Sequence, residues 1–227
     1  MPASRKAEEL KSILERLPQV TSVGGVRVRD SIIKSISIET KSTGRVTAQQ
    51  LEVDDAAALY DFYFQGLSEK RRCFFIPYPL FHTPPATADE LARRIADWKK
   101  EDDWSALKLV KDKQIIGFAL LKRFQTEQVT SAIAIRDDFV RMGLAYLLQT
   151  IVIEQARLLN LKKFHVKVVS DNLASVRLHE KCGFKQTRIV PWDGYEDLLA
   201  FLSESDNGTH KAADRHIIEM VIKLNSE

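Results

Sequence analysis

The sequence of 227 residues has little of what marks several large protein classes. Its two cysteines, Cys73 and Cys182, are far apart and in no metal-ligand spacing, so neither a disulfide framework nor a metal site is expected. It has no apolar run long enough to span a membrane, and its first residues lack the apolar core of a signal peptide. We therefore expect a cytoplasmic protein that binds neither a metal nor a membrane.

An excess of charge of one sign is also absent. The chain has 34 Lys and Arg residues against 31 Asp and Glu residues, a net charge of +3 that is too small to indicate nucleic acid binding. Hydrophobic residues make up 44% and charged residues 29%, as in ordinary globular domains. With no internal repeat, this length indicates one large domain, or one domain with an extension.

The first 44 residues are predicted to form an N-terminal extension. Residues 5–17 place leucine and isoleucine on one helical face, and Pro18 ends that helix. Alternating polar and apolar residues over 26–38 indicate an extra strand or hairpin. This extension is mildly basic, and we expect a solvated appendage that packs on the main domain. A partner-binding surface is the alternative.

From residue 45 onward, strand patterns alternate with helix patterns. A helix between two strands requires a crossover and some parallel pairing, whereas hairpins are antiparallel. We therefore predict one mixed α/β domain over residues 45–227, with helices flanking a central sheet. A polar insertion at 192–215 is a candidate contact surface for a homodimer. The expected strands are 45–53, 104–110, 114–123, 129–135, 164–169, 184–191 and 217–224, and the expected helices are 54–65, 87–100, 143–159 and 172–181.

The first chemically informative segment is 135–148. A strand ends there, a short polar turn follows, and Gly143-Leu144-Ala145 begins an apolar helix. Small residues let a ligand approach the backbone, and the free amides of a helix N-terminus attract anions such as a pyrophosphate. By itself, Gly-x-Ala is more typical of an ordinary tight turn.

The second segment is 172–184, with the sequence NLASVRLHEKCGF. Asn172 is a good helix N-cap and Gly183 a good C-terminal stop, and these roles need no ligand. The information lies in the combination of the two segments, in this order and at this separation.

Together the segments resemble two motifs of the GCN5-related N-acetyltransferase (GNAT) superfamily. The phosphate-loop pattern of that family, (Gln/Arg)-x-x-Gly-x-(Gly/Ala), aligns on residues 140–145, and the pattern Asn-x-x-(Ala/Ser)-x-x-Leu-Tyr-x-Lys-x-Gly-Phe aligns on 172–184. The expected element order is similar as well, so the resemblance covers residues 45–224. It implies an α/β fold of GNAT type, whose mixed central sheet has a splayed strand pair that binds a pantetheine arm.

The resemblance also implies the chemistry. A GNAT enzyme transfers an acetyl group from acetyl-CoA, its cosubstrate, to a primary amine by direct attack, and a backbone amide stabilises the oxyanion. No metal is involved. The acceptor, a small molecule, a peptide or a protein amine, stays open. The residues that the resemblance assigns to acetyl-CoA are Ile133, Ile135, Arg141, Met142, Gly143, Leu144, Ala145 and Asn172.

Three positions depart from the family pattern. Val140 stands where Gln or Arg normally braces the loop. His179 replaces the usual Tyr that protonates the thiolate; histidine can also donate a proton, and a surface or packing histidine is the alternative. Val129 stands where some members have a catalytic Glu. Glu127, two residues earlier, is therefore the candidate general base, with a turn carboxylate or a water relay as alternatives. These departures leave open an acyl-CoA-binding sensor or scaffold without useful catalysis.

Residues 67–75, LSEKRRCFF, allow two interpretations. The charges at 69–72 are typical of a solvated helix end. The segment is also similar to one in bacterial and archaeal protein-lysine acetyltransferases of this superfamily, which would place it near the acceptor groove. The aromatic residues here would then wall the acceptor site; otherwise they cover the sheet.

Overall fold

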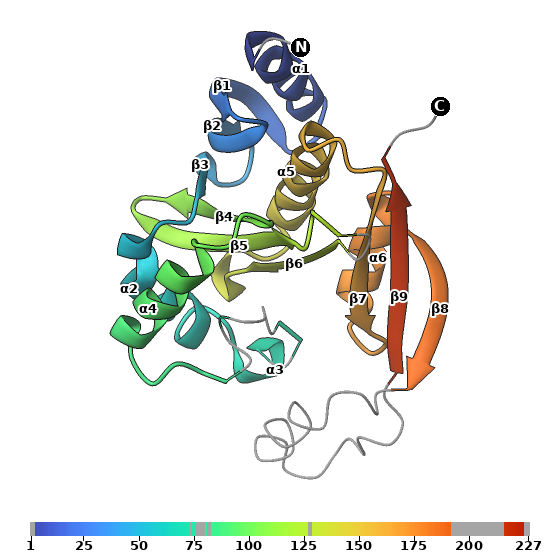
Figure 1. The fold of residues 1–227 in the computed structure, drawn as a ribbon. Helices are drawn as coiled ribbons and strands as arrows, with labels where there is room; N and C mark the ends of the chain where they lie inside the picture. The colour runs from blue at the N-terminus through green and yellow to red at the C-terminus, as the bar shows by residue number, and fades with distance from the viewer. Residues whose placement is uncertain are drawn as a thin grey trace.

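The computed structural model describes residues 3–72, 74–75, 80, 83–126, 129–191 and 216–224. Within them the strands form one sheet in the order β1-β2-β3-β4-β5-β6-β7-β9-β8 (Figure 1). The strands are β1 (Val20–Arg29), β2 (Ile32–Thr40), β3 (Gly44–Gln50), β4 (Trp104–Lys111), β5 (Gln114–Lys122), β6 (Thr130–Ile135), β7 (Lys163–Val169), β8 (Lys185–Pro191) and β9 (His216–Lys223). The helices are α1 (Ala3–Glu15), α2 (Ala56–Phe64), α3 (Glu69–Arg72), α4 (Ala88–Trp98), α5 (Leu144–Leu158) and α6 (Leu173–Lys181), with 3-10 turns at Val53–Asp55 and Asp137–Phe139.

The predicted mixed α/β fold is confirmed. From β3 onward the described elements follow the predicted order, apart from the short additional helix α3. The first 44 residues form α1 and an antiparallel hairpin, β1–β2, which joins the same sheet through β3. The insertion at 192–215, and with it the predicted homodimer surface, lies outside the described residues.

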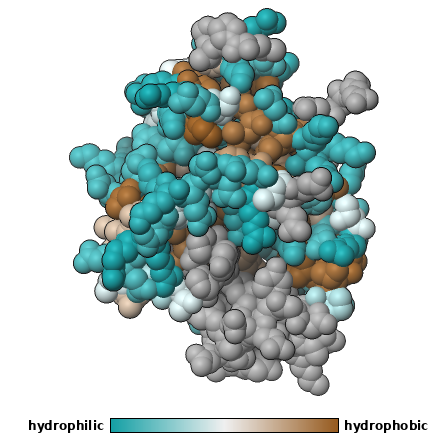
Figure 2. Space-filling model, viewed as in Figure 1, coloured by the Kyte–Doolittle hydropathy of each residue, from teal (hydrophilic) through white to brown (hydrophobic). Residues whose placement is uncertain are grey.

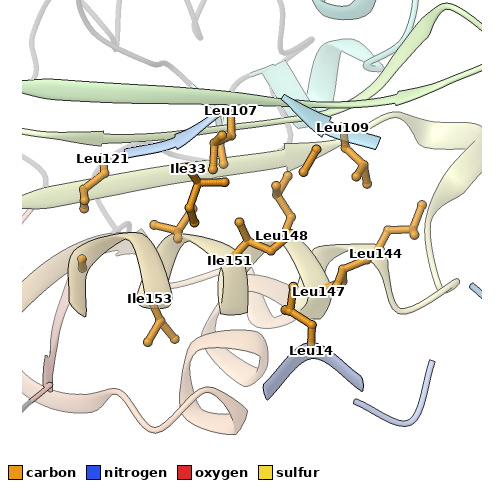
Figure 3. Packing of buried hydrophobic residues seen from close by; sticks show 14 of the residues in the cluster. Leu14, Ile33, Leu107, Leu109, Leu121, Leu144, Leu147, Leu148, Ile151 and Ile153 are labelled. Atoms are coloured by element: carbon orange, nitrogen blue, oxygen red, sulfur yellow. The ribbon is translucent and has the colours of Figure 1, made fainter. Parts of the chain in front are cut away.

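Helices cover both faces of the sheet. On one face, α5 packs its apolar residues against Leu107, Leu109 and Leu121, and Leu14 of α1 reaches α5 from the other side (Figure 3). On the opposite face, α2 and α4 pack over a second apolar cluster. Because α5 lies between the sheet and α1, its apolar residues are buried, and each such leucine contributes roughly 1.5–3 kcal/mol. None of the described helices has the length and apolar character needed to cross a membrane.

A buried glutamine attaches the N-terminal hairpin to α5. Gln155 is 0% exposed, and its side-chain Nε2 donates to the Ser31 carbonyl oxygen (2.9 Å). Its Oε1 accepts from the Ile33 backbone N–H (2.8 Å). Both polar atoms of this side chain are therefore satisfied by the β1–β2 hairpin, as a buried amide requires. The hairpin and α5 are thus fixed to each other.

Two neighbouring parallel strands, β6 and β7, separate along their length (Figure 1). Their described register pairs Thr130 with His165 alone, and His165 N donates to Val129 O (2.9 Å). Beyond this point β6 continues to Ile135 and β7 to Val169. The divergence opens the middle of the sheet next to the N-terminus of α5.

At the other end of the sheet, β8 is the terminal strand. Figure 2 shows apolar residues gathered over the β8–β9 edge, and Ile189 on β8 is 54% exposed. This edge is far along the sheet from the β1–β2 hairpin, since β1 forms the opposite end of the strand order.

Candidate active site

A cavity of about 690 Å³ lies where β6 ends and α5 begins. Four parts of the chain line it: α3 with the residues around it, the end of β6, the turn before α5, and α6. Among the described lining residues are five basic side chains and a single carboxylate, Asp137. The excess of positive charge favours an anionic ligand. The basic residues are Lys70, Arg71, Arg141, Arg177 and Lys181.

The turn before α5 presents backbone amides to this cavity. Arg141 (φ +63°) and Gly143 (φ +78°) adopt the left-handed conformation, and Leu147 N donates to Gly143 O (3.1 Å) in the first turn of the helix. The amides of Leu144 and Ala145 come before that bond, so the helix does not satisfy them. All these residues except Leu147 line the cavity. Free amides and the helix dipole make this turn an anion site.

The exposed edge of β6 supplies further backbone groups. Ile135 lies opposite Gly117 in the β5–β6 ladder, and Arg136 N donates to Ile116 O (2.8 Å). In an antiparallel ladder this pattern turns the N–H and C=O groups of Ile135, and of Ile133 two residues earlier, away from β5. They face the gap on the β7 side, and both residues line the cavity. An extended ligand can pair with this edge as a strand would.

Asn172, which the resemblance assigns to acetyl-CoA, lines the cavity. Its side-chain Oδ1 accepts from Ser175 N (3.2 Å), so it also caps α6. The side-chain amide nitrogen is therefore the group with which Asn172 can donate to a ligand. Met142, in contrast, turns away from the described lining: its carbonyl oxygen accepts from Ser42 Oγ (3.1 Å).

Arg71 and Asp137 join α3 to the end of β6. Arg71 Nη1 donates to Asp137 Oδ1 (2.8 Å) and to the Ile135 carbonyl oxygen (3.0 Å), and Ser68 N donates to Asp137 Oδ2 (3.1 Å). Burial alone would raise the pKa of Asp137, but the hydrogen bonds from Arg71 and Ser68 outweigh it and hold the pKa below its usual value. Asp137 is therefore ionised near pH 7 and is committed to this ion pair.

Residues 69–72 form the short helix α3, none of whose residues is buried, and its two arginines also bond neighbouring segments. Arg72 Nη1 donates to the carbonyl oxygens of Phe64 (2.9 Å) and Leu67 (3.1 Å), and Arg71 is held as described above. Leu67, Phe74 and Phe75 line the cavity. The sequence feature that indicated a place near the site was the similarity of residues 67–75 to a segment of protein-lysine acetyltransferases. The composition of the segment did not indicate it.

His179 lies in the core. It is 4% exposed, its Nδ1 donates to the Ser175 carbonyl oxygen (2.7 Å), and its ring meets Phe184 edge-on. Since a carbonyl only accepts, the proton of the neutral ring is on Nδ1. Burial lowers the pKa of His179, so the ring is neutral at pH 7 and Nε2 has no proton to donate. The described cavity lining includes its neighbours Leu178 and Lys181 but not His179. This placement favours the packing alternative, and the acid role stays a prediction.

Among the described residues, the remaining candidates add no catalytic group. Glu127, the predicted base, and Cys73 lie outside the described residues. Val129, at the family's Glu position, is 2% exposed. Burial raises the pKa of the Cys182 thiol to about 12, so it is not a nucleophile at neutral pH.

The comparisons with known proteins agree with this geometry. A family model described as "Acetyltransferase (GNAT) domain" matches residues 45–185. A search of curated proteins finds no match.

Several solved structures share the fold. A GNAT-family acetyltransferase from Streptococcus pneumoniae has a TM-score of 0.58 and 19% identity, over 79% of this chain and 99% of that one. The GNAT domain of S. lividans PAT has a TM-score of 0.60 and 16% identity, over 84% and 97%. Spermidine N-acetyltransferase from Vibrio cholerae, solved with CoA and spermine, has a TM-score of 0.59 and 17% identity, over 79% and 95%. Since the family model matches more than half of the chain, the chain belongs to the GNAT acetyltransferase family.

Proposed function

We propose that the protein is an acetyl-CoA-dependent N-acetyltransferase that transfers the acetyl group to a primary amine by direct attack. One observation carries the proposal: the unpaired edge of β6 and the basic, amide-lined turn before α5 meet in one cavity. Acetyl-CoA has phosphates at one end and an extended, amide-bearing arm at the other. It therefore needs an anion site next to an open strand edge.

The residues present fit acetyl-CoA. The amides of Gly143, Leu144 and Ala145 would hold the pyrophosphate, with Arg141 beside them to add charge. The backbone groups of Ile133 and the N–H of Ile135 would pair with the amide groups of the pantetheine arm, since the Ile135 carbonyl already accepts from Arg71. When bound, acetyl-CoA supplies an activated acetyl group as its thioester.

The chain's part in the reaction is mainly to position and polarise. An N–H of the β6 edge that donates to the thioester oxygen would stabilise the negative charge that develops there during attack. The C–N bond forms, the C–S bond breaks, and the ammonium must lose a proton while the thiolate gains one. We assign neither proton transfer to a described side chain; Glu127 and a relay of water molecules are the proposed routes from the amine.

The acceptor end of the cavity is formed by α3, Phe74 and Phe75. Spermidine and spermine are sensible first small acceptors, because a protein of similar fold is a spermidine N-acetyltransferase. Peptides and lysine-bearing proteins belong in the same panel, because of the similarity of residues 67–75 to protein-lysine acetyltransferases.

The test measures free thiol released from acetyl-CoA with each acceptor, and identifies the acetylated product by its added mass. CoA binding is measured in parallel by calorimetry. We expect CoA binding and thiol release that depends on one class of amine. If CoA does not bind, the proposal is wrong.

A second candidate function is an acyl-CoA-binding sensor without catalysis. The burial of His179 away from the described lining favours it, since the family's usual acid position then lacks an available proton. This alternative predicts CoA binding with no acceptor-dependent thiol across the whole panel.

A further inference from the structure

The N-terminal extension, residues 1–44, contacts the amide-lined turn directly. Ser42 Oγ donates to the Met142 carbonyl oxygen (3.1 Å), and the Thr43 hydroxyl lies 3.5 Å from Met142 Sδ. Gln19 packs against Gly143 from the same side. These contacts join segments that are far apart in the sequence, since Ser42 and Met142 are separated by 100 positions.

The Ser42 hydrogen bond fixes the orientation of one peptide plane. In a trans peptide, the carbonyl oxygen and the following N–H point in opposite directions. Because Met142 C=O points to Ser42, the Gly143 N–H points away from the extension. Gly143 lines the cavity, so this orientation directs its N–H to the side where an anion would bind.

Gln19 fills the space behind Gly143. A Cβ atom at Gly143 would lie 3.0 Å from Gln19 Cβ and 3.1 Å from Gln19 Cγ, closer than side chains normally approach. Gln19 is itself held, because Lys41 N donates to its carbonyl oxygen (3.0 Å). Gln19 therefore limits movement of the turn toward the extension, and a side chain at position 143 would press on Gln19 as well as strain the left-handed φ.

The extension is packed against α5 and hydrogen-bonded to it. Leu14 and Ile33 are each 0% exposed and belong to the same apolar cluster as α5. Gln155 adds two hydrogen bonds from α5 to the β1–β2 turn. Because the extension is attached to α5, the helix that follows the turn, its contacts with the turn can hold the turn in one conformation.

We infer that Gln19 and Ser42 of the N-terminal extension are positioning residues, which hold the backbone amides of residues 143–145 in the orientation that binds the pyrophosphate of CoA. The inference rests on the proposed function. It gives the extension a part in donor binding, beyond that of an appendage packed on the domain.

The experiment measures CoA binding by calorimetry in the full chain and in Ser42→Ala, Gln19→Ala and the double variant. We expect the dissociation constant to rise about threefold for Ser42→Ala and about tenfold for the double variant, the range for lost hydrogen bonding and packing. Ser42→Thr, which keeps the hydroxyl, should bind within about twofold of the wild type. Ser12→Ala makes the same change on the exposed face of α1, and it should also bind CoA within about twofold of the wild type.

A second ligand separates a positioning role from a structural one. Pantetheine lacks the pyrophosphate, and its weaker binding can be followed by ligand-observed NMR. We expect the double variant to bind pantetheine as the wild type does, with an unchanged melting temperature. Equal CoA affinity in the double variant and the wild type would overturn the inference, and so would equal weakening of CoA and pantetheine. Wild-type protein that fails to bind CoA would instead overturn the proposed function.

Discussion

The two ends of the cavity are built from different groups. The proposed donor end, at residues 133–135 and 141–145, consists mainly of backbone amides and carbonyls on a strand edge and a helix N-terminus. The proposed acceptor end consists of side chains: the Arg71–Asp137 pair, Leu67, Phe74 and Phe75.

This difference explains why one end has a sequence signature. A site made of backbone demands residues with particular φ values and small size, as at Gly143, and leaves most other side chains free. A site made of side chains changes with its ligand. The donor end should therefore respond mainly to changes in backbone access and charge, and the acceptor end to removal of single side chains.

The largest expected effect is at Ala145. Ala145→Glu would place a carboxylate among the amides of the donor end, and we expect CoA affinity to fall at least about 100-fold through repulsion of the pyrophosphate. The fold should survive, because an acidic residue in the first turn of a helix is favourable. Ala88→Glu is the matched control, since it adds the same charge to the first turn of α4, away from the described cavity lining. Calorimetry with CoA that gives equal affinities for both variants would contradict the account of the donor end.

Two buried glutamines on α5 test what supports the donor end. Gln155 and Gln149 are both 0% exposed, but Gln155 bonds the β1–β2 turn, whereas the Gln149 amide has no hydrogen-bond partner among the described residues. We expect Gln155→Leu to lower the free energy of unfolding by about 2–4 kcal/mol, because it leaves a buried N–H and C=O unpaired. Gln149→Leu should be neutral, or stabilising by about 1 kcal/mol. Urea titrations of both variants check this, and the reverse ranking would refute it.

At the acceptor end, Arg71→Ala removes the side chain that ties α3 to β6. We expect acceptor-dependent thiol release to fall about tenfold, since two charge-assisted hydrogen bonds are lost, while the CoA dissociation constant changes less than about threefold. Arg71→Lys keeps the charge without the guanidinium geometry, so its thiol release should lie between that of the wild type and that of Arg71→Ala. If Arg71→Ala lowers CoA affinity as much as it lowers thiol release, the two ends of the cavity do not act independently.

The smallest effect concerns His179. Burial lowers its pKa below the usual 6.5, so the unfolded chain binds more protons than the folded one near that pH. The free energy of unfolding should therefore decrease as the pH falls through about 6.5, and His179→Gln should flatten this slope. Burial also lowers the pKa of His165, so we expect some pH dependence of the free energy of unfolding to remain in His179→Gln. Denaturant titrations of both proteins across this pH range measure the free energy of unfolding.

The same variant addresses catalysis. If His179 only packs, His179→Gln should change acceptor-dependent thiol release less than about threefold at a pH where the protein is stable. A loss of about a hundredfold would return His179 to the mechanism as the acid.

Much of the fold could be predicted from the sequence, for local reasons. The apolar periodicity of α5, the small residues at its N-terminus and the Asn172 cap each impose a local conformation that the structure shows. The family resemblance assigned Ile133, Ile135 and Asn172 to acetyl-CoA; the three residues line one cavity, and their part in binding stays a prediction.

The rest depended on contacts between distant segments. Nothing local at Ser42 or Gln19 indicates that they lie behind residues 142–143, because that contact is created by the pairing of β2 with β3 and by the packing of the hairpin on α5. The bonds of Arg71 could not be predicted, because its partners, Asp137 and the Ile135 carbonyl, are more than sixty positions away. The burial of His179 depends on Phe184 and the strand that follows it.

The most direct test of the account is an NMR titration of the isotope-labelled protein with CoA, following backbone amide shifts. We predict the largest shifts at Gly143, Leu144 and Ala145, with a second group at the β6 edge around Ile133 and Ile135, and small shifts elsewhere on the described sheet. Shifts that avoid both groups, or the absence of any shift at saturating CoA, would contradict the claim that this cavity binds the acetyl donor through the backbone.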